Sequence, residues 1–133
     1  MPKKIVVVDD DSFMLDVIKV CLADICDVAM TDDSRKAVAL IEAEKPDMVI
    51  LDLLMPGVTG LDILTKLRHT GSMMPVLMLT SLGEINIAGQ ALALGACEVM
   101  TKPFDPQQLR RTVELKLSSE KADTSRSPCR INE

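Results

Sequence analysis

Five short aliphatic runs recur along the chain, and the segments between them carry apolar residues at helical spacing. We expect the runs to form strands at residues 5–8, 28–30, 48–51, 76–79 and 99–101. The strands are apolar on both faces, which is typical of a parallel sheet covered by helices on each side. The alternation therefore predicts a doubly wound α/β fold with five strands and five helices.

Capping residues and apolar spacing place the helices. Ser12 is expected to cap the first helix, and Ser34 to open the second. The third is expected over residues 60–68, and the fourth is the weakest of the five because Gly89 lies inside it. Asp105 as cap and Pro106 at the first helical position predict the start of the fifth helix.

The length of 133 residues suits one core and is too short for two. We expect a single domain over residues 1–117, because the five strand and helix units end there. Residues 118–133 are polar and nearly devoid of core residues. We expect them to form a disordered tail or the start of a linker, with no output domain attached.

Composition argues against several classes of function. The net charge is −5 and there is no Trp or Tyr, which disfavours direct binding of nucleic acid. No apolar run approaches the roughly 18 residues of a membrane span, so we expect a cytoplasmic protein without membrane contact. The four cysteines form no CxxC pair and His69 is the only histidine, which disfavours zinc and redox sites.

Polar residues whose side chains can take part in a reaction follow four of the five predicted strands. In a doubly wound sheet, ligands bind beyond the carboxyl ends of the strands, where the strand order reverses. We expect three kinds of group to meet at this rim: carboxylates, a hydroxyl and an ammonium. They belong to Asp9, Asp10 and Asp11 after the first strand, Asp52 after the third, Thr80 after the fourth and Lys102 at the fifth.

Each of these residues has an ordinary interpretation when taken alone, as a helix cap, a structural hydroxyl or a solvated lysine. Their joint arrangement at four separate strand ends is not explained in that way. Clustered carboxylates can hold Mg²⁺, and a carboxylate can act as a nucleophile that becomes an aspartyl phosphate. A lysine and a hydroxyl can contact phosphoryl oxygens. The set is therefore suited to phosphoryl transfer.

Four stretches, "VVVDDDS", "VILDLLMPGVTGLDIL", "VLMLTS" and "GACEVMTKPF", occur in this order within residues 3–117. With them the chain resembles the receiver domain of response regulators in two-component signalling. The resemblance implies a flavodoxin-like fold with a five-stranded parallel sheet in the order 2-1-3-4-5.

The resemblance also implies a role for each matching residue. Asp52 would be the phosphoacceptor, and it would bind Mg²⁺ together with Asp9, Asp10 and the backbone carbonyl of Leu54. Asp11 matches none of these roles, and we assign it to the loop or to the helix cap.

The remaining matches concern the response to phosphorylation. By the same resemblance, Thr80 would be the hydroxyl that responds to phosphorylation, and Lys102 would contact the phosphoryl group. The peptide bond from Lys102 to Pro103 is expected to be cis.

The implied reaction takes a phosphoryl group from a phosphohistidine on a sensor histidine kinase or a histidine phosphotransfer protein. The chain would catalyse its own modification rather than turn over a free substrate. One rival is a phosphohydrolase of the haloacid dehalogenase type, which needs a second acid two residues after the nucleophile, where Leu54 stands. A second rival is a receiver-like module that binds proteins without being phosphorylated.

Overall fold

The computed structural model describes residues 3–53, 55–81, 85–119 and 130–132 of the chain. Its strands form one parallel sheet, in which the first five have the order β2-β1-β3-β4-β5. The predicted fold class and strand order are thus confirmed. The strands are β1 (Lys4–Val8), β2 (Asp27–Thr31), β3 (Met48–Asp52), β4 (Val76–Ser81) and β5 (Glu98–Lys102).

A sixth strand, β6 (Arg130–Asn132), pairs in parallel with β5 and was not predicted from the sequence. A run of three residues is too short to show either helical or strand periodicity. The segment lies within the stretch that we expected to be a disordered tail or a linker.

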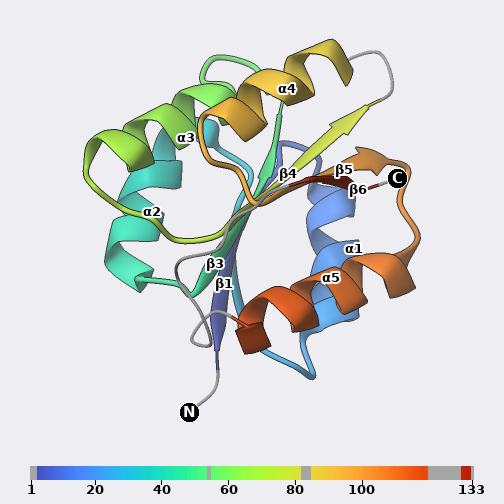
Figure 1. Ribbon diagram of the computed structural model, residues 1–133. Coiled ribbons are helices and arrows are strands. Elements are labelled where there is room, and N and C mark those ends of the chain that lie inside the picture. Colours follow the sequence, from blue (N-terminus) through green and yellow to red (C-terminus); the bar gives the residue numbers. More distant parts are fainter. Residues whose placement is uncertain (1–2, 54, 82–84, 120–129, 133) are drawn as a thin grey trace.

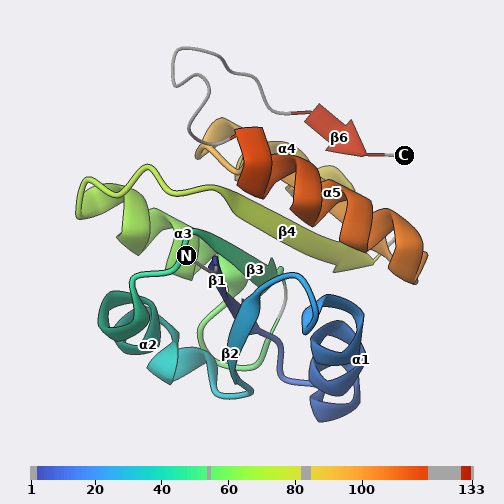
Figure 2. The same cartoon turned by 90° about the horizontal axis from the view of Figure 1, so that it is seen from below.

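The helices cover both faces of the sheet (Figure 1). α1 (Ser12–Leu22) and α5 (Pro106–Ser119) lie on one face. The other face is covered by α2 (Ala37–Glu44), α3 (Gly60–His69) and α4 (Ile85–Ala93), and a short 3₁₀ helix, η1 (Ser34–Lys36), precedes α2. Figure 2 shows the two layers from below, with α1 and α2 on opposite sides of β1.

Alternate residues of each strand supply two separate cores, because successive side chains of a strand point to opposite faces. In β1, Val6 and Val8 pack with the residues of α2 and α3, whereas Ile5 and Val7 pack with those of α1 and α5. All four are fully buried. This two-sided burial is the physical reason for the unbroken aliphatic runs in the sequence.

Two helix starts differ from the predictions by one or more residues. Asp11, which was assigned to the loop or the helix cap, caps α1 in place of Ser12: its Oδ1 accepts hydrogen bonds from the backbone N–H groups of Phe13 and Met14. Asp33 caps η1, so that Ser34 opens a 3₁₀ turn before α2. Neighbouring Asp and Ser residues are both good caps, which makes the choice between them a matter of backbone geometry.

The start of α5 agrees with the sequence: Pro106 is its first residue, and Asp105 accepts a hydrogen bond from the backbone N–H of Gln107. The expected cis peptide bond between Lys102 and Pro103 is present. Within the described residues, no helix is both long enough and apolar enough to cross a membrane.

Candidate functional site

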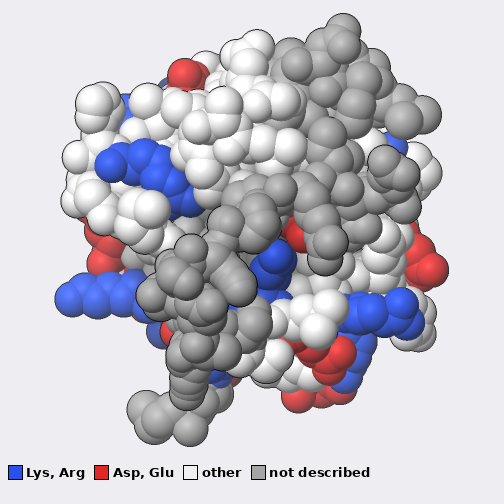
Figure 3. Space-filling view, in the orientation of Figure 1, with Lys and Arg blue, Asp and Glu red and all other residues white. Residues whose placement is uncertain are grey.

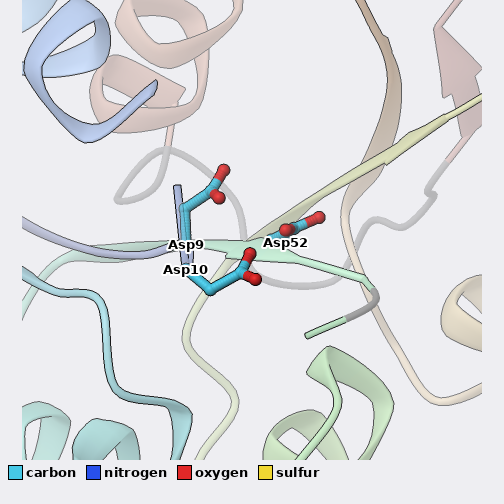
Figure 4. A group of neighbouring side chains, drawn as sticks. All are labelled: Asp9, Asp10 and Asp52. Carbon is cyan, nitrogen blue, oxygen red and sulfur yellow. The ribbon is translucent and has the colours of Figure 1, made fainter. Parts of the chain in front are cut away.

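Three carboxylates meet beyond the ends of β1 and β3. These strands are neighbours, and their register pairs Val8 with Leu51, so the residues that follow lie at the same level of the sheet. Asp9, Asp10 and Asp52 each offer an oxygen, and these oxygens lie within 4.8 Å of one another. Figure 4 shows the three side chains beside each other at this rim. Asp9, Asp10 and Asp52 therefore form an acidic cluster as expected, whereas Asp11 caps α1 instead.

The backbone around β1 fixes the first two aspartates. The Asp9 N–H donates to the carbonyl of Thr31 at 3.3 Å, which ties the end of β1 to the end of β2. The Asp9 Oδ1 accepts a hydrogen bond from the N–H of Asp11 at 3.0 Å. Asp9 is fully buried, whereas Asp10 is exposed. One carboxylate thus lies inside the site and its neighbour faces solvent.

Lys102 provides a positive charge from the end of β5. Its Nζ lies 2.9 Å from Oδ2 of Asp9 and 3.4 Å from Oδ1 of Asp52. Lys102 contacts two of the three carboxylates and contributes one positive charge, so these four described residues together carry excess negative charge when all three carboxylates are ionised. Such a cluster favours a bound cation, because like charges at this spacing repel one another strongly.

The local electrostatics act most strongly on Asp52. Burial, followed by the charge of Asp9, raises the pKa of Asp52 to about 7, although Lys102 acts in the opposite direction. Burial lowers the pKa of Lys102, but its hydrogen bond and ion pair with Asp9 and its contact with Asp52 outweigh this, so the net shift is upward. The ammonium is thereby kept charged beside the two buried carboxylates.

Thr80 lies near the end of β4, at the same rim of the sheet. The register pairs Asp52 with Leu79, so Thr80 is one residue beyond the level of Asp52 on the neighbouring strand. Its side chain is buried, and its Oγ1 donates a hydrogen bond to the carbonyl of Ser81 at 3.2 Å. Leu54, whose backbone carbonyl was predicted to bind the metal, lies outside the described residues.

Gly60 supports the site and was not singled out in the sequence. It begins α3, and its N–H donates to the carbonyl of Leu53 at 2.8 Å. A Cβ added at Gly60 would collide with the backbone oxygen of Asp52. A glycine is therefore needed for α3 to pack this closely against the end of β3. The only signal in the sequence was a glycine at a helix start.

Ser34 is a second supporting residue whose role the sequence did not reveal. It is buried, and its Oγ donates to the carbonyl of Pro56 at 3.2 Å. This bond links η1 to the segment that follows β3. A cleft of about 420 Å³ opens here, lined by Asp10, Asp33, Ser34 and Pro56 among others. The exposed side of the acidic cluster is thus accessible from solvent.

Comparisons with known proteins show the family of the chain. The Response regulator receiver domain family matches residues 5–114 of the chain. The transcriptional regulatory protein PhoP of alkaline phosphatase synthesis, from Bacillus subtilis, is 36% identical over 115 residues, which are 86% of this chain and 48% of PhoP. The DNA-binding response regulator MtrA of Mycobacterium leprae is 33% identical over 118 residues, 88% of this chain and 52% of MtrA.

Solved structures show the same fold. A response regulator receiver domain protein from Clostridium thermocellum is similar with a TM-score of 0.84 and 31% identity, covering 90% of this chain and 98% of that one. The chemotaxis protein CheY4 of Vibrio cholerae is similar with a TM-score of 0.80 and 28% identity, covering 86% of this chain and 98% of that one.

The fold and the acidic rim are those of a receiver domain. The chain belongs to the response regulator receiver domain family. It spans about half the length of the curated relatives described above.

Proposed function

We propose that Asp52 accepts a phosphoryl group from a phosphohistidine of a partner protein, in a reaction that depends on Mg²⁺. The observation that carries this proposal is the position of Asp52: its carboxylate is buried within 4.8 Å of the Asp9 and Asp10 oxygens and 3.4 Å from the Lys102 ammonium. A nucleophile, a set of cation ligands and a fixed positive charge thus share one site.

The residues present fit Mg²⁺. This ion prefers oxygen ligands, keeps several waters and is usually held by one or two carboxylates. Asp9, Asp10 and Asp52 supply such ligands, and the exposed side of Asp10 leaves room for water. When bound, Mg²⁺ would offset negative charge on the phosphoryl group. The carbonyl of Leu54 as a further ligand stays a prediction from the family resemblance.

In the proposed step, an oxygen of Asp52 forms a bond to phosphorus while the bond from phosphorus to the donor imidazole nitrogen breaks. The electron pair of the broken bond stays on the imidazole, and the product is an aspartyl phosphate. Lys102 already lies beside Asp52 and would donate a hydrogen bond to a phosphoryl oxygen. Thr80, one residue beyond the level of Asp52, would respond to the new group.

The proposed partners are a sensor histidine kinase or a histidine phosphotransfer protein. The chain would catalyse its own modification and would not turn over a free substrate. We propose no direct binding of nucleic acid by these 133 residues, since their net charge is −5. The face in Figure 3 supports this, because Lys and Arg are scattered there among acidic and uncharged side chains. MtrA is DNA-binding by name, and the residues matched by this chain are 52% of its length.

The test is intact-mass analysis after incubation with acetyl phosphate, with and without Mg²⁺. We expect one added phosphoryl group, dependent on Mg²⁺ and absent from Asp52→Asn. The matched control is Asp16→Asn on the exposed part of α1, which should be modified like the wild type. A folded wild-type protein that binds Mg²⁺ but takes up no phosphate from any donor would instead indicate a phosphorylation-independent binding module.

A further inference from the structure

The outer edge of β5 is occupied by a strand from the far end of the chain. The register pairs Glu98 with Arg130, Val99 with Ile131 and Met100 with Asn132. Figure 1 shows β6 in dark red alongside β5 at the edge of the sheet. The contact joins segments about thirty residues apart in the sequence, so it is a tertiary contact and not a local turn.

An uncovered β5 would be exposed to unwanted pairing. The backbone N–H and C=O groups on the outer side of an edge strand can pair with any extended segment that reaches them. Parallel pairing requires a crossover connection of a dozen or more residues, usually containing a helix. α5, which runs from Pro106 to Ser119, provides that helix between β5 and β6. The connection is thus of the kind that brings β6 to this edge.

The cover on β5 is short. β5 has five residues, and the register with β6 includes only Glu98, Val99 and Met100. Strands in globular proteins usually have about five or six residues, and short terminal elements open with small free energies. The covalent connection keeps β6 at a local concentration on the order of millimolar. This favours the return of β6 to the edge of β5 over its replacement by a dilute competing strand.

We propose that the outer edge of β5 is a strand-docking site and that the chain fills it reversibly with its own residues 130–132. The occupant acts as an intramolecular cover, and its release leaves β5 open to backbone pairing. This inference does not depend on the phosphoacceptor role of Asp52.

Amide hydrogen exchange of the full chain, followed by NMR, tests the docking. Successive N–H groups of a strand point to opposite sides, so replacing two adjacent residues removes any donor that faces β5. The variant is Arg130→Pro with Ile131→Pro, and the control is Thr124→Pro with Ser125→Pro. We expect the outward amides among residues 98–100 to exchange at least about threefold faster in the variant than in the control. Equal exchange rates of these amides in the variant and in the control would overturn the proposal.

Two native cysteines provide a second test. Cys97 precedes Glu98 and Cys129 precedes Arg130 in the sequence, so the proposed docking should raise the rate at which these two thiols meet. Diamide would take two electrons and two protons from the thiol pair, forming a disulfide and the reduced hydrazine. We expect an intramolecular Cys97–Cys129 bond, identified by peptide mass mapping, to form at least about fivefold faster than a Cys21–Cys129 bond.

In the proline variant, the Cys97–Cys129 disulfide should no longer form faster than the Cys21–Cys129 disulfide. A mixture of pairings in the wild type, or a bond between two copies of the chain, would show that residues 130–132 do not dock on their own β5.

Discussion

Asp52 is buried beside two other aspartates, a placement that is unfavourable for a charged carboxylate. Burial and the charge of Asp9 raise its pKa to about 7, far above that of an aspartate in an unfolded chain. Folding at neutral pH therefore costs free energy at this one residue. The cost is consistent with a functional position, because a site chosen for stability alone would place an uncharged residue here.

Asp52→Asn is expected to stabilise the metal-free protein. The folded-state pKa is raised, so the destabilising charge is absent below the unfolded pKa of about 4 and grows as the pH rises toward 7. We expect the variant to gain on the order of 1–3 kcal/mol in free energy of unfolding at about pH 8, and clearly less at about pH 5. Urea titrations in EDTA measure both values. A gain that is equal at both pH values would contradict this account, and Asp16→Asn should show none.

Gly60 offers a second test at the residue scale. In Gly60→Ala the new Cβ would push against the backbone oxygen of Asp52, so we expect a loss of about 1–3 kcal/mol in free energy of unfolding and slower uptake of phosphate. Gly89 is the matched control, since a Cβ added there in α4 meets nothing within 4 Å. Gly89→Ala should stabilise the protein by about 0.5–1 kcal/mol. Similar effects of the two substitutions would refute the steric argument.

The sequence predicted the acidic site better than it predicted its supporting residues. Asp9, Asp10 and Asp52 could be found because strand ends in a parallel sheet converge at one rim, whatever the exact helix packing. Gly60 could not, because its role depends on how closely α3 approaches the end of β3. A close approach between backbones leaves no trace in the hydrophobic pattern.

Elements were predictable where a periodic pattern was long enough. The first five strands lie within one or two residues of the predicted runs, and α5 begins at Pro106 as expected. The capping pattern placed the cap of α1 one residue late, at Ser12, because Asp11 and Ser12 are both suitable caps; the assignment of Asp11 to the loop or the helix cap is confirmed. β6 was missed because three residues carry no periodicity and its pairing with β5 is a tertiary interaction.

Arg68 connects two helices of one layer. From the end of α3 its guanidinium donates to four backbone carbonyls, those of Ser72, Met74, Leu94 and Gly95, at 2.8 to 3.3 Å. The last two carbonyls follow α4, so one side chain fixes the end of α4 against α3. The arginine thereby satisfies backbone acceptors that would otherwise have to be hydrated.

Arg68→Ala is expected to lower the free energy of unfolding by about 1–3 kcal/mol, because several charge-assisted hydrogen bonds are lost together. Arg111, which is exposed on α5, gives the matched control Arg111→Ala, with an expected change below about 0.5 kcal/mol. Chemical denaturation of both variants measures the difference. Equal losses would show that the carbonyl contacts of Arg68 add nothing to stability.

At the scale of the whole molecule, one sheet carries both the proposed phosphoacceptor site and the proposed strand-docking edge. β5 ends in Lys102, whose Nζ contacts Asp9, and its first three residues pair with β6. The doubly wound fold was predictable from the strict alternation of strands and helices, whereas the sixth strand extends the sheet beyond that pattern.

Mg²⁺ is expected to stabilise the folded protein, because the unfolded chain does not hold the three carboxylates together. At one hundred times the dissociation constant, the linkage amounts to about 2.7 kcal/mol. Thermal melts should show a Tm that rises with Mg²⁺ and returns to its starting value with EDTA. Asp10→Asn should weaken the rise and Asp16→Asn should not. A Tm that is independent of Mg²⁺ would argue against the metal site.

Locating the phosphoryl group itself would show whether Asp52 is the phosphoacceptor. After incubation with acetyl phosphate and Mg²⁺, an aspartyl phosphate can be reduced with borohydride, which marks the modified aspartate for tandem mass spectrometry of its peptide. We expect the mark at Asp52, with Asp9, Asp10 and Asp11 unmarked. A mark at any other residue in folded protein would contradict the assignment of Asp52 as the phosphoacceptor.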